Sequence, residues 1–402
     1  MSNLGLTRQR VMSIDVLRGI IMVIMALDHV RDFFFKASLK STGSIALDPT
    51  NMATTTPGLF FTRWITHFCA PIFVFLAGTS AYLISLRKTK KQLSEFLVKR
   101  GCWLVLVEIF IITFAWTFNP FYNVIILQVI WAIGVSMLLL GLLVHLPLKL
   151  ILVLGLVIVM GHNLLQYAPF NTFKGGFWTD LLYYTNFTAY QIDQNHLVLI
   201  VYSFLPWTGV MLLGFYFGKL YEAGMQAARR RKILILLGSG LFLFFLVLRA
   251  INVYGDLQPW STQPRGSEYS FLSFFNTNKY PPSLDYLCMT LGPAMMMLAL
   301  LEKIQNRFTA IMILYGRVPM LYYIAHLYLI HLIGVIVFYA AGFTSKDIIT
   351  LGSPFFFRPP GLGFPLPGVY TIWVIVVLAL YPLCKWYDRY KSTHKNWWLS
   401  YL

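Results

Sequence analysis

Residues 58–91 have the sequence GLFFTRWITHFCAPIFVFLAGTSAYLISLRKTKK, in which a long apolar run ends in a cluster of basic residues. A helix needs roughly 20 mainly apolar residues to cross the hydrocarbon core of a bilayer. Loops on the cytoplasmic side of a membrane collect lysine and arginine. We therefore predict that residues 58–86 span a membrane and that the basic loop at residues 87–100 faces the cytoplasm.

The composition of the whole chain indicates a membrane protein. Of its 402 residues, 58% are hydrophobic and only 12% are charged, whereas about a quarter of the residues in a soluble domain are charged. The net charge of +17 arises mainly from basic residues at the ends of apolar segments, which is the positive-inside bias rather than a sign of nucleic-acid binding. We predict one integral domain over residues 1–402 in the inner (plasma) membrane, with the lipid bilayer as its main partner and no nucleic acid.

The apolar segments predict an all-α polytopic bundle of about ten transmembrane helices. The expected spans are residues 13–35, 58–86, 101–118, 124–146, 147–166, 196–221, 233–254, 283–301, 312–341 and 369–386. With this count every basic cluster falls on one side: Arg8 and Arg10, residues 87–100, residues 229–232 and the tail from Lys385 to Lys395. Both termini are therefore expected in the cytoplasm. The ninth segment is too long for one upright span, and we expect an irregular start at residues 316–319.

The first span carries several ionisable residues, which are expensive in a bilayer and so indicate function. Asp15 and Arg18 are three residues apart near the cytoplasmic end, where Arg18 can anchor the helix or reach phosphates. Near the outer end, Asp28, His29 and Asp32 fall within one or two turns. A carboxylate beside an imidazole can orient a general base, so we predict a catalytic role for His29 with Asp28 or Asp32.

The second span offers Arg63 and His67, which share a helix face at about the depth of His29. The chain has no HxxxH or HxH spacing in this region, so we predict no metal site. His326 and His331 are five residues apart and do not form one chelating face, and His326 either packs with a hydrogen bond or lines a cavity. Lys279 lies in an aromatic outer loop that would suit a sugar. We assign Lys279 and His326 to substrate binding.

Two stretches resemble a known family. Residues 13–29, from Ser13-Ile14-Asp15-Val16-Leu17-Arg18-Gly19 to Asp28-His29, and residues 62–80 resemble the heparan-alpha-glucosaminide N-acetyltransferase-like family, bacterial branch. The first stretch is also similar to the acyltransferase-3 family of membrane O-acyltransferases. The motifs are strongest in residues 8–90, and weaker matches at residues 205–214, 279–284 and 316–331 extend the resemblance to the ninth span.

The resemblance implies transfer of an acetyl group from acetyl-CoA, bound on the cytoplasmic side, to an amine or hydroxyl of an envelope sugar or glycan. Acetyl-CoA is then a co-substrate, and no metal is expected. The acyltransferase-3 pattern places its histidine at His29 and its arginine at Arg18. In the animal lysosomal relatives the position of His29 resembles Asn, and the active histidine follows the first span. This chain has no histidine between Val30 and Thr66, so His29 or His67 must act.

These assignments give a specific hypothesis. His29 deprotonates the acceptor, Arg63 or His67 stabilises the developing oxyanion, and Arg18 with residues 87–100 holds the CoA phosphates. The alternative is a secondary transporter with a buried Asp/His/Arg site, although only one helix break, near Pro319, supports it. The sequence does not specify the oligomeric state and admits a homodimer.

Overall fold

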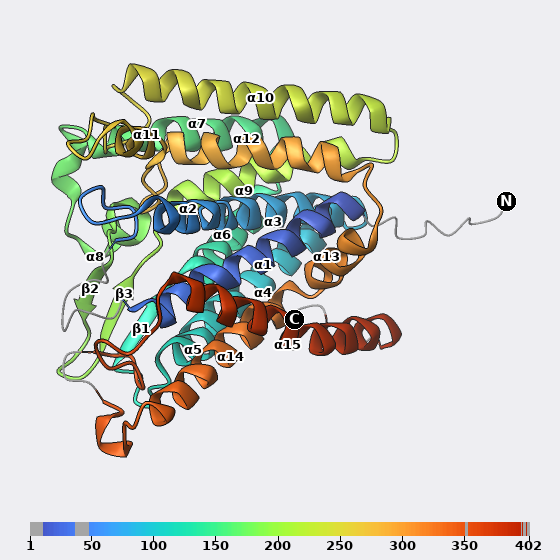
Figure 1. Ribbon diagram of the computed structural model, residues 1–402. Helices are drawn as coiled ribbons and strands as arrows, with labels where there is room; N and C mark the ends of the chain where they lie inside the picture. The colour runs from blue at the N-terminus through green and yellow to red at the C-terminus, as the bar shows by residue number, and fades with distance from the viewer. Residues whose placement is uncertain (1–10, 37–47, 350–352, 395, 397–398, 400–402) are drawn as a thin grey trace.

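The computed structural model describes residues 11–36, 48–349, 353–394, 396 and 399. Arg8, Arg10 and Lys395, which enter the predicted topology, lie outside this part of the chain. The described residues are mostly helical, and the helices run side by side as a bundle (Figure 1). The longer helices of the bundle are α1 Met12–Phe34, α2 Pro57–Thr66, α3 Cys69–Ser85, α4 Lys90–Leu106, α6 Val129–Leu143, α7 Leu148–Gly161, α9 Leu205–Phe217, α10 Ala227–Ile251, α12 Leu284–Leu301, α13 Arg307–Arg317, α14 Pro319–Ala340 and α15 Leu366–Thr393.

Shorter elements complete the described fold. Three strands form one sheet, while short helical segments extend or connect the longer helices. These elements are η2 Val107–Ile112, α5 Thr113–Thr117, β1 Val124–Leu127, η3 His162–Gln166, η4 Phe170–Phe173, α8 Phe177–Thr179, η5 Asp180–Tyr184, β2 Thr188–Gln191, β3 Leu197–Ile200, η6 Gly218–Tyr221, α11 Ser267–Phe275 and η7 Ser345–Asp347. The strands, α8 and α11 gather at one end of the bundle, and the start of α1 lies at the other (Figure 1).

Six stretches of the described helices are long and apolar enough to cross a membrane: residues 57–85, 148–166, 227–251, 284–301, 319–340 and 366–393. The other predicted spans correspond to α1, which carries charged residues, to α4–η2–α5, and to the shorter helices α6 and α9. The protein is therefore a helical membrane protein with at least these six candidate spans. The count of ten and the placement of both termini in the cytoplasm stay predictions.

The structure corrects the all-α prediction at one end of the bundle. Residues 124–127 and 197–200, predicted as the starts of two transmembrane helices, are the parallel strands β1 and β3, and β2 pairs antiparallel to β3. Both strands are runs of Val, Ile and Leu, whose β-branched members favour strands. Helices α6 and α9 begin only after these strands end.

Two other boundaries differ from or refine the predictions. Residues 90–100, predicted as part of a loop, form the first turns of α4, because Thr89 and Gln92 make a capping box and good helix formers follow. The irregular start predicted at residues 316–319 is a break between two helices: α13 ends at Arg317 and α14 begins at Pro319. Proline suits the first position of a helix because an N–H at that position has no acceptor within the helix, so its absence costs no hydrogen bond.

Helix α1 lies at the centre of the bundle, where it packs against α2, α3, α12, α13, α14 and α15. Glycines let its backbone approach that of α13. A Cβ added to Gly19 would lie 1.8 Å from the carbonyl oxygen of Met312, and one added to Gly316 would lie 1.9 Å from that of Asp15. Small residues at such contacts allow the backbones of two membrane helices to approach each other closely. The tight packing fixes α1, and therefore fixes the residues near its carboxyl end.

Candidate active site

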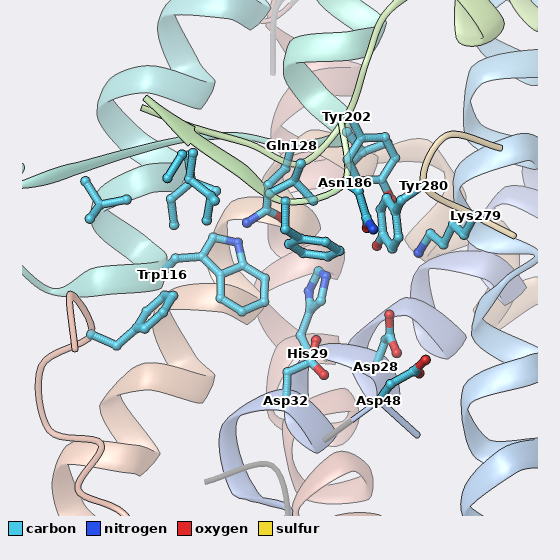
Figure 2. Close-up of a pocket in the computed structure, with 18 of the residues that line it drawn as sticks. Asp28, His29, Asp32, Asp48, Trp116, Gln128, Asn186, Tyr202, Lys279 and Tyr280 are labelled. Carbon is cyan, nitrogen blue, oxygen red and sulfur yellow. The ribbon is translucent and has the colours of Figure 1, made fainter. Parts of the chain in front are cut away.

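A cavity of about 1640 Å³ opens at the end of the bundle that carries the sheet. Its walls come from the carboxyl end of α1, from α2, from the sheet, and from the loops at residues 276–281 and 353–360. Figure 2 shows His29 at the base of this space, with Trp116 and Gln128 on one side and Lys279, Tyr280 and Tyr202 on the other. A pocket of this size that joins distant parts of a chain is the first place to look for function.

A pair of buried histidines lies at the base of the cavity. The Nδ1 atom of His29 lies 2.6 Å from the Nε2 atom of His326, and the two rings are stacked. The Nδ1 atom of His326 lies 2.9 Å from the carbonyl oxygen of Tyr322. His326 is fully buried behind His29 and is not among the residues that line the cavity.

This geometry assigns the tautomers when both rings are neutral. A carbonyl oxygen only accepts, so Nδ1 of His326 carries a proton and its Nε2 is an acceptor. His29 must then donate from Nδ1, which leaves the lone pair on its own Nε2. Among the described residues, none hydrogen-bonds to Nε2 of His29, and Figure 2 shows the ring pointing into the cavity. The arrangement presents a base to whatever occupies the cavity.

Aromatic rings hold His29 from two sides. The indole of Trp116 meets the imidazole edge-on at 5.0 Å between ring centroids, and the ring of Tyr323 does so at 6.1 Å. Both side chains are buried. Packing of this kind restricts the ring to one orientation, which a preorganised catalytic group needs.

The carboxylates predicted to orient His29 have other partners. One carboxylate oxygen of Asp28 lies 2.8 Å from a guanidinium nitrogen of Arg31, and the other lies 2.5 Å from a guanidinium nitrogen of Arg63. The hydroxyl of Thr66 donates a hydrogen bond of 2.9 Å to the same carboxylate. Asp32 lies 2.6 Å from Arg31. In the described part of the chain no hydrogen bond joins His29 to either carboxylate. Neighbouring side chains on a helix do not face each other, so Asp28 points away from His29.

The other predicted residues lie at different depths. His67 and Arg63 line the cavity with His29, and the His67 ring packs edge-on against Tyr286 at 5.5 Å. Arg18 lies elsewhere, toward the start of α1, where it donates to Asp15, to Ser80 and to the carbonyl oxygen of Gly316 at 3.0–3.2 Å. The structure brings together all the predicted residues except Arg18, with His326 behind His29 rather than in the cavity wall.

Lys279 enters the cavity from a loop that is held firmly. Asp256 accepts hydrogen bonds from the backbone N–H of Asn278 and from the hydroxyl of Ser283, both at 2.7 Å. Arg249, 1% exposed, donates to three carbonyl oxygens at residues 273–276. These contacts fix the loop on both sides of Lys279.

Sequence reasoning missed Trp116 and Arg358. The guanidinium of Arg358 lies over Phe33 and Phe355 at 4.4 and 4.9 Å, and it donates to the carbonyl oxygen of Asp32. Burial lowers its pKa to about 10, although the nearby Asp32 opposes the shift. A basic residue in a predicted outer loop departs from the positive-inside bias, and that departure was the available signal. No comparable signal marked Trp116.

Fold and site together define a polytopic membrane protein with an oriented histidine at the base of a large cavity. In the part of the chain that the structure describes, no group of three or more His, Cys, Asp or Glu side chains could hold a metal ion. The chain belongs to the heparan-alpha-glucosaminide N-acetyltransferase family, because the model of that family's catalytic domain matches residues 10–249, more than half of the chain. A comparison with curated proteins finds no match. Family membership indicates an acetyltransferase that acts on glycans.

Proposed function

We propose that this protein transfers an acetyl group from cytoplasmic acetyl-CoA to an amine or hydroxyl of an envelope sugar or glycan bound in the cavity, with His29 as the general base. The observation that carries the proposal is the pair of histidines. Nδ1 of His29 contacts His326, and this contact leaves Nε2 of His29 as the lone-pair nitrogen facing the cavity.

The reaction can be written from these residues. Nε2 of His29 takes the proton from the acceptor amine or hydroxyl while the nitrogen or oxygen of that acceptor group attacks the thioester carbonyl. Nε2 of His326 accepts the hydrogen bond from Nδ1 of the resulting His29 imidazolium. The new C–N or C–O bond replaces the C–S bond, and the proton leaves His29 for the departing thiolate of CoA. The oxyanion that forms on the carbonyl needs nearby donors, and Arg63 and His67 are the proposed groups because both line the cavity.

The donor would approach along α1 from the cytoplasmic side of the inner membrane. Arg18 and His29 are eleven residues apart, which is about 16 Å along a helix. The proposed role of Arg18 is to help hold the CoA phosphates at that depth, together with the basic residues at positions 87–100. Arg18 already donates to Asp15 and Ser80, so binding at this depth would require these contacts to rearrange.

The proposal is tested by CoA release and labelled product from radiolabelled acetyl-CoA, using purified protein in detergent. His29→Ala should lose about a hundredfold or more in kcat, since a positioned base contributes about 10²–10⁴. His67→Ala should reduce activity less. His331→Ala is the matched control, because His331 is also a buried histidine of the bundle but, among the described residues, contacts the carbonyl oxygens of Ala115 and Phe356 instead of His29. Wild-type protein that is folded yet neither binds nor turns over acetyl-CoA would contradict the proposal and favour a transporter.

A further inference from the structure

Gln128 is a polar side chain of the cavity wall that the proposed mechanism does not use. It is the single residue between β1 and α6, and Figure 2 shows it on the same side of His29 as Trp116. It occupies the position before the first turn of α6, yet its side chain makes no capping hydrogen bond to that helix. Among the described residues, no hydrogen bond uses its carboxamide. The two N–H donors of this group are therefore available to a molecule in the cavity.

The start of α6 is capped by Glu108 instead. Oε2 of Glu108 accepts a hydrogen bond of 2.8 Å from the backbone N–H of Trp131, in the first turn of α6. Glu108 is 0% exposed and belongs to the π-helix η2, and within the described part of the chain its Oε1 has no hydrogen-bond partner. Burying a carboxyl group with one oxygen unpaired is costly, and π-helical turns are rare and often occur at functional sites. The cost and the rare turn both indicate that Glu108 has a functional role.

The strand that precedes Gln128 is held as firmly as the helix that follows it. The hydroxyl of Thr113 accepts a hydrogen bond of 3.1 Å from the backbone N–H of Ile126. The carbonyl oxygen of Leu127 accepts two more, at 3.0 and 3.1 Å, from the backbone N–H groups of residues 201 and 202. The backbone is thus fixed on both sides of Gln128. A donor held in this way needs little reorganisation when negative charge develops beside it, which is the requirement for stabilising an oxyanion.

We propose that Gln128 is a catalytic residue whose carboxamide N–H donates to the oxyanion of the acetyl-transfer step. Glu108 is then a positioning residue that acts on Gln128 through the start of α6. The inference rests on the proposed function and adds a neutral donor to Arg63 and His67. Arg63 is already paired with Asp28 at 2.5 Å, whereas the carboxamide of Gln128 has no such partner.

The charge that Gln128 would stabilise exists only during the reaction. As the acceptor nitrogen or oxygen bonds to the carbonyl carbon of the thioester, an electron pair of the C=O bond moves onto the oxygen. The pair returns when the C–S bond breaks, and the leaving thiolate of CoA takes the proton from His29. Since the ground-state carbonyl carries much less charge, removal of the donor should lower kcat and leave KM nearly unchanged.

The test measures transfer from radiolabelled acetyl-CoA to glucosamine by purified protein in detergent. Gln128→Met, which keeps the length and removes the donor, should lower kcat about a hundredfold or more. Gln128→Glu should be at least as low, because a carboxylate has no N–H and repels the oxyanion. Both KM values should change by less than about threefold. Gln191→Met is the matched control, because Gln191 lines the same cavity but is exposed and donates to the carbonyl oxygen of Asp193.

A double-mutant cycle tests the positioning role of Glu108. Glu108→Leu should lower kcat about tenfold or more in the wild-type background but less than about threefold in the Gln128→Met background, because residues that act through one another are not additive. Glu108→Gln, which keeps an acceptor oxygen for the N–H of Trp131, should recover most of the activity. A purely structural role would give the same loss in both backgrounds, and that result would overturn the role assigned to Glu108.

The remaining outcomes separate this inference from the proposed function. Wild-type kcat in Gln128→Glu, or a higher KM for glucosamine with unchanged kcat in Gln128→Met, would overturn the inference and make Gln128 a sugar ligand or a wall residue. The acetyltransferase proposal would survive either result. Absence of transfer by folded wild-type protein would contradict the proposed function and this inference with it.

Discussion

At the scale of single residues, the site depends on a contact between side chains 297 positions apart in the sequence. His326 fixes the tautomer of His29 through its own bond to a backbone carbonyl oxygen. The acids beside His29 instead neutralise two arginines. In the proposed mechanism the imidazole pair prepares the base, whereas the carboxylate–guanidinium cluster holds the helix ends around it.

Replacing His326 should reduce turnover without comparable loss of binding. In His326→Leu the Nδ1–H of His29 loses its acceptor, so we expect kcat to fall about tenfold to a hundredfold, by analogy with the loss of partners that orient metal-binding histidines. KM for acetyl-CoA should change less than threefold, and His326→Gln, which offers an acceptor oxygen, should recover part of the loss. If His331→Leu had the same effect on kcat, the role assigned to His326 would be wrong.

Removing the charge of Asp28 should destabilise the protein. In Asp28→Asn the guanidinium groups of Arg31 and Arg63 lose a buried partner, and breaking a buried ion pair in this way costs roughly 3–5 kcal/mol. We expect a clearly lower midpoint of thermal unfolding in detergent. The control is Asp193→Asn, whose carboxylate lies in an exposed turn. Equal midpoints for Asp28→Asn and wild type would show that the cluster has no structural role.

At the scale of elements, glycine contacts determine how closely the helices pack. A Cβ on Gly78 of α3 would lie 2.1 Å from the carbonyl oxygen of Met211 on α9, and one on Gly214 of α9 would lie 2.1 Å from that of Phe75 on α3. Neither position can accept a methyl group unless the helices separate. Both helices adjoin the core that supports α1 and the cavity.

The glycine contacts give a paired prediction. Gly78→Ala should lower stability by about 1–3 kcal/mol, because it overpacks a helix contact. Gly240→Ala lies on the helix α10 with open space around the added methyl group, so it should be neutral or stabilise by up to about 1 kcal/mol through helix propensity. The measurement is thermal unfolding of both variants in the same detergent. A Gly78→Ala variant as stable as Gly240→Ala would contradict the packing.

Sequence analysis predicted α1 within one residue at each end, because its apolar length and charged ends are local signals. It also predicted that His29, Arg63 and His67 share a site, since both spans place them at one depth. It could not pair His29 with His326, which depends on how α14 packs against α1. It also assigned residues 124–127 and 197–200 to helices, because short apolar runs do not distinguish a buried strand from a helix.

At the scale of the whole molecule, the cavity lies at the end of the bundle opposite the start of α1. The proposed topology places that opening outside the cytoplasm and the basic start of α4 inside it. The acetyl thioester of CoA would then reach most of the way across the bilayer, from the cytoplasmic side, to meet the acceptor in the cavity. The positions of Arg18 and His29 along α1 match this arrangement.

Cysteine labelling tests the topology. In a Cys102→Ser background, Glu268→Cys on α11 should react with a membrane-impermeant maleimide in intact cells, whereas Glu95→Cys on α4 should react only after the cells are opened. Both glutamates are exposed in the structure, so access depends on the side of the membrane. Labelling of Glu95→Cys in intact cells would reverse the proposed orientation.

The most direct test of the account is acetyl transfer across a membrane by purified protein in liposomes. Labelled acetyl-CoA would be supplied on the side of the basic helix ends, with an amino-sugar acceptor on the side of the cavity. The account predicts labelled product on the cavity side for the wild type, and a rate lower by about a hundredfold or more for His29→Ala. Product formed at the wild-type rate by His29→Ala, or none formed by folded wild type, would contradict it.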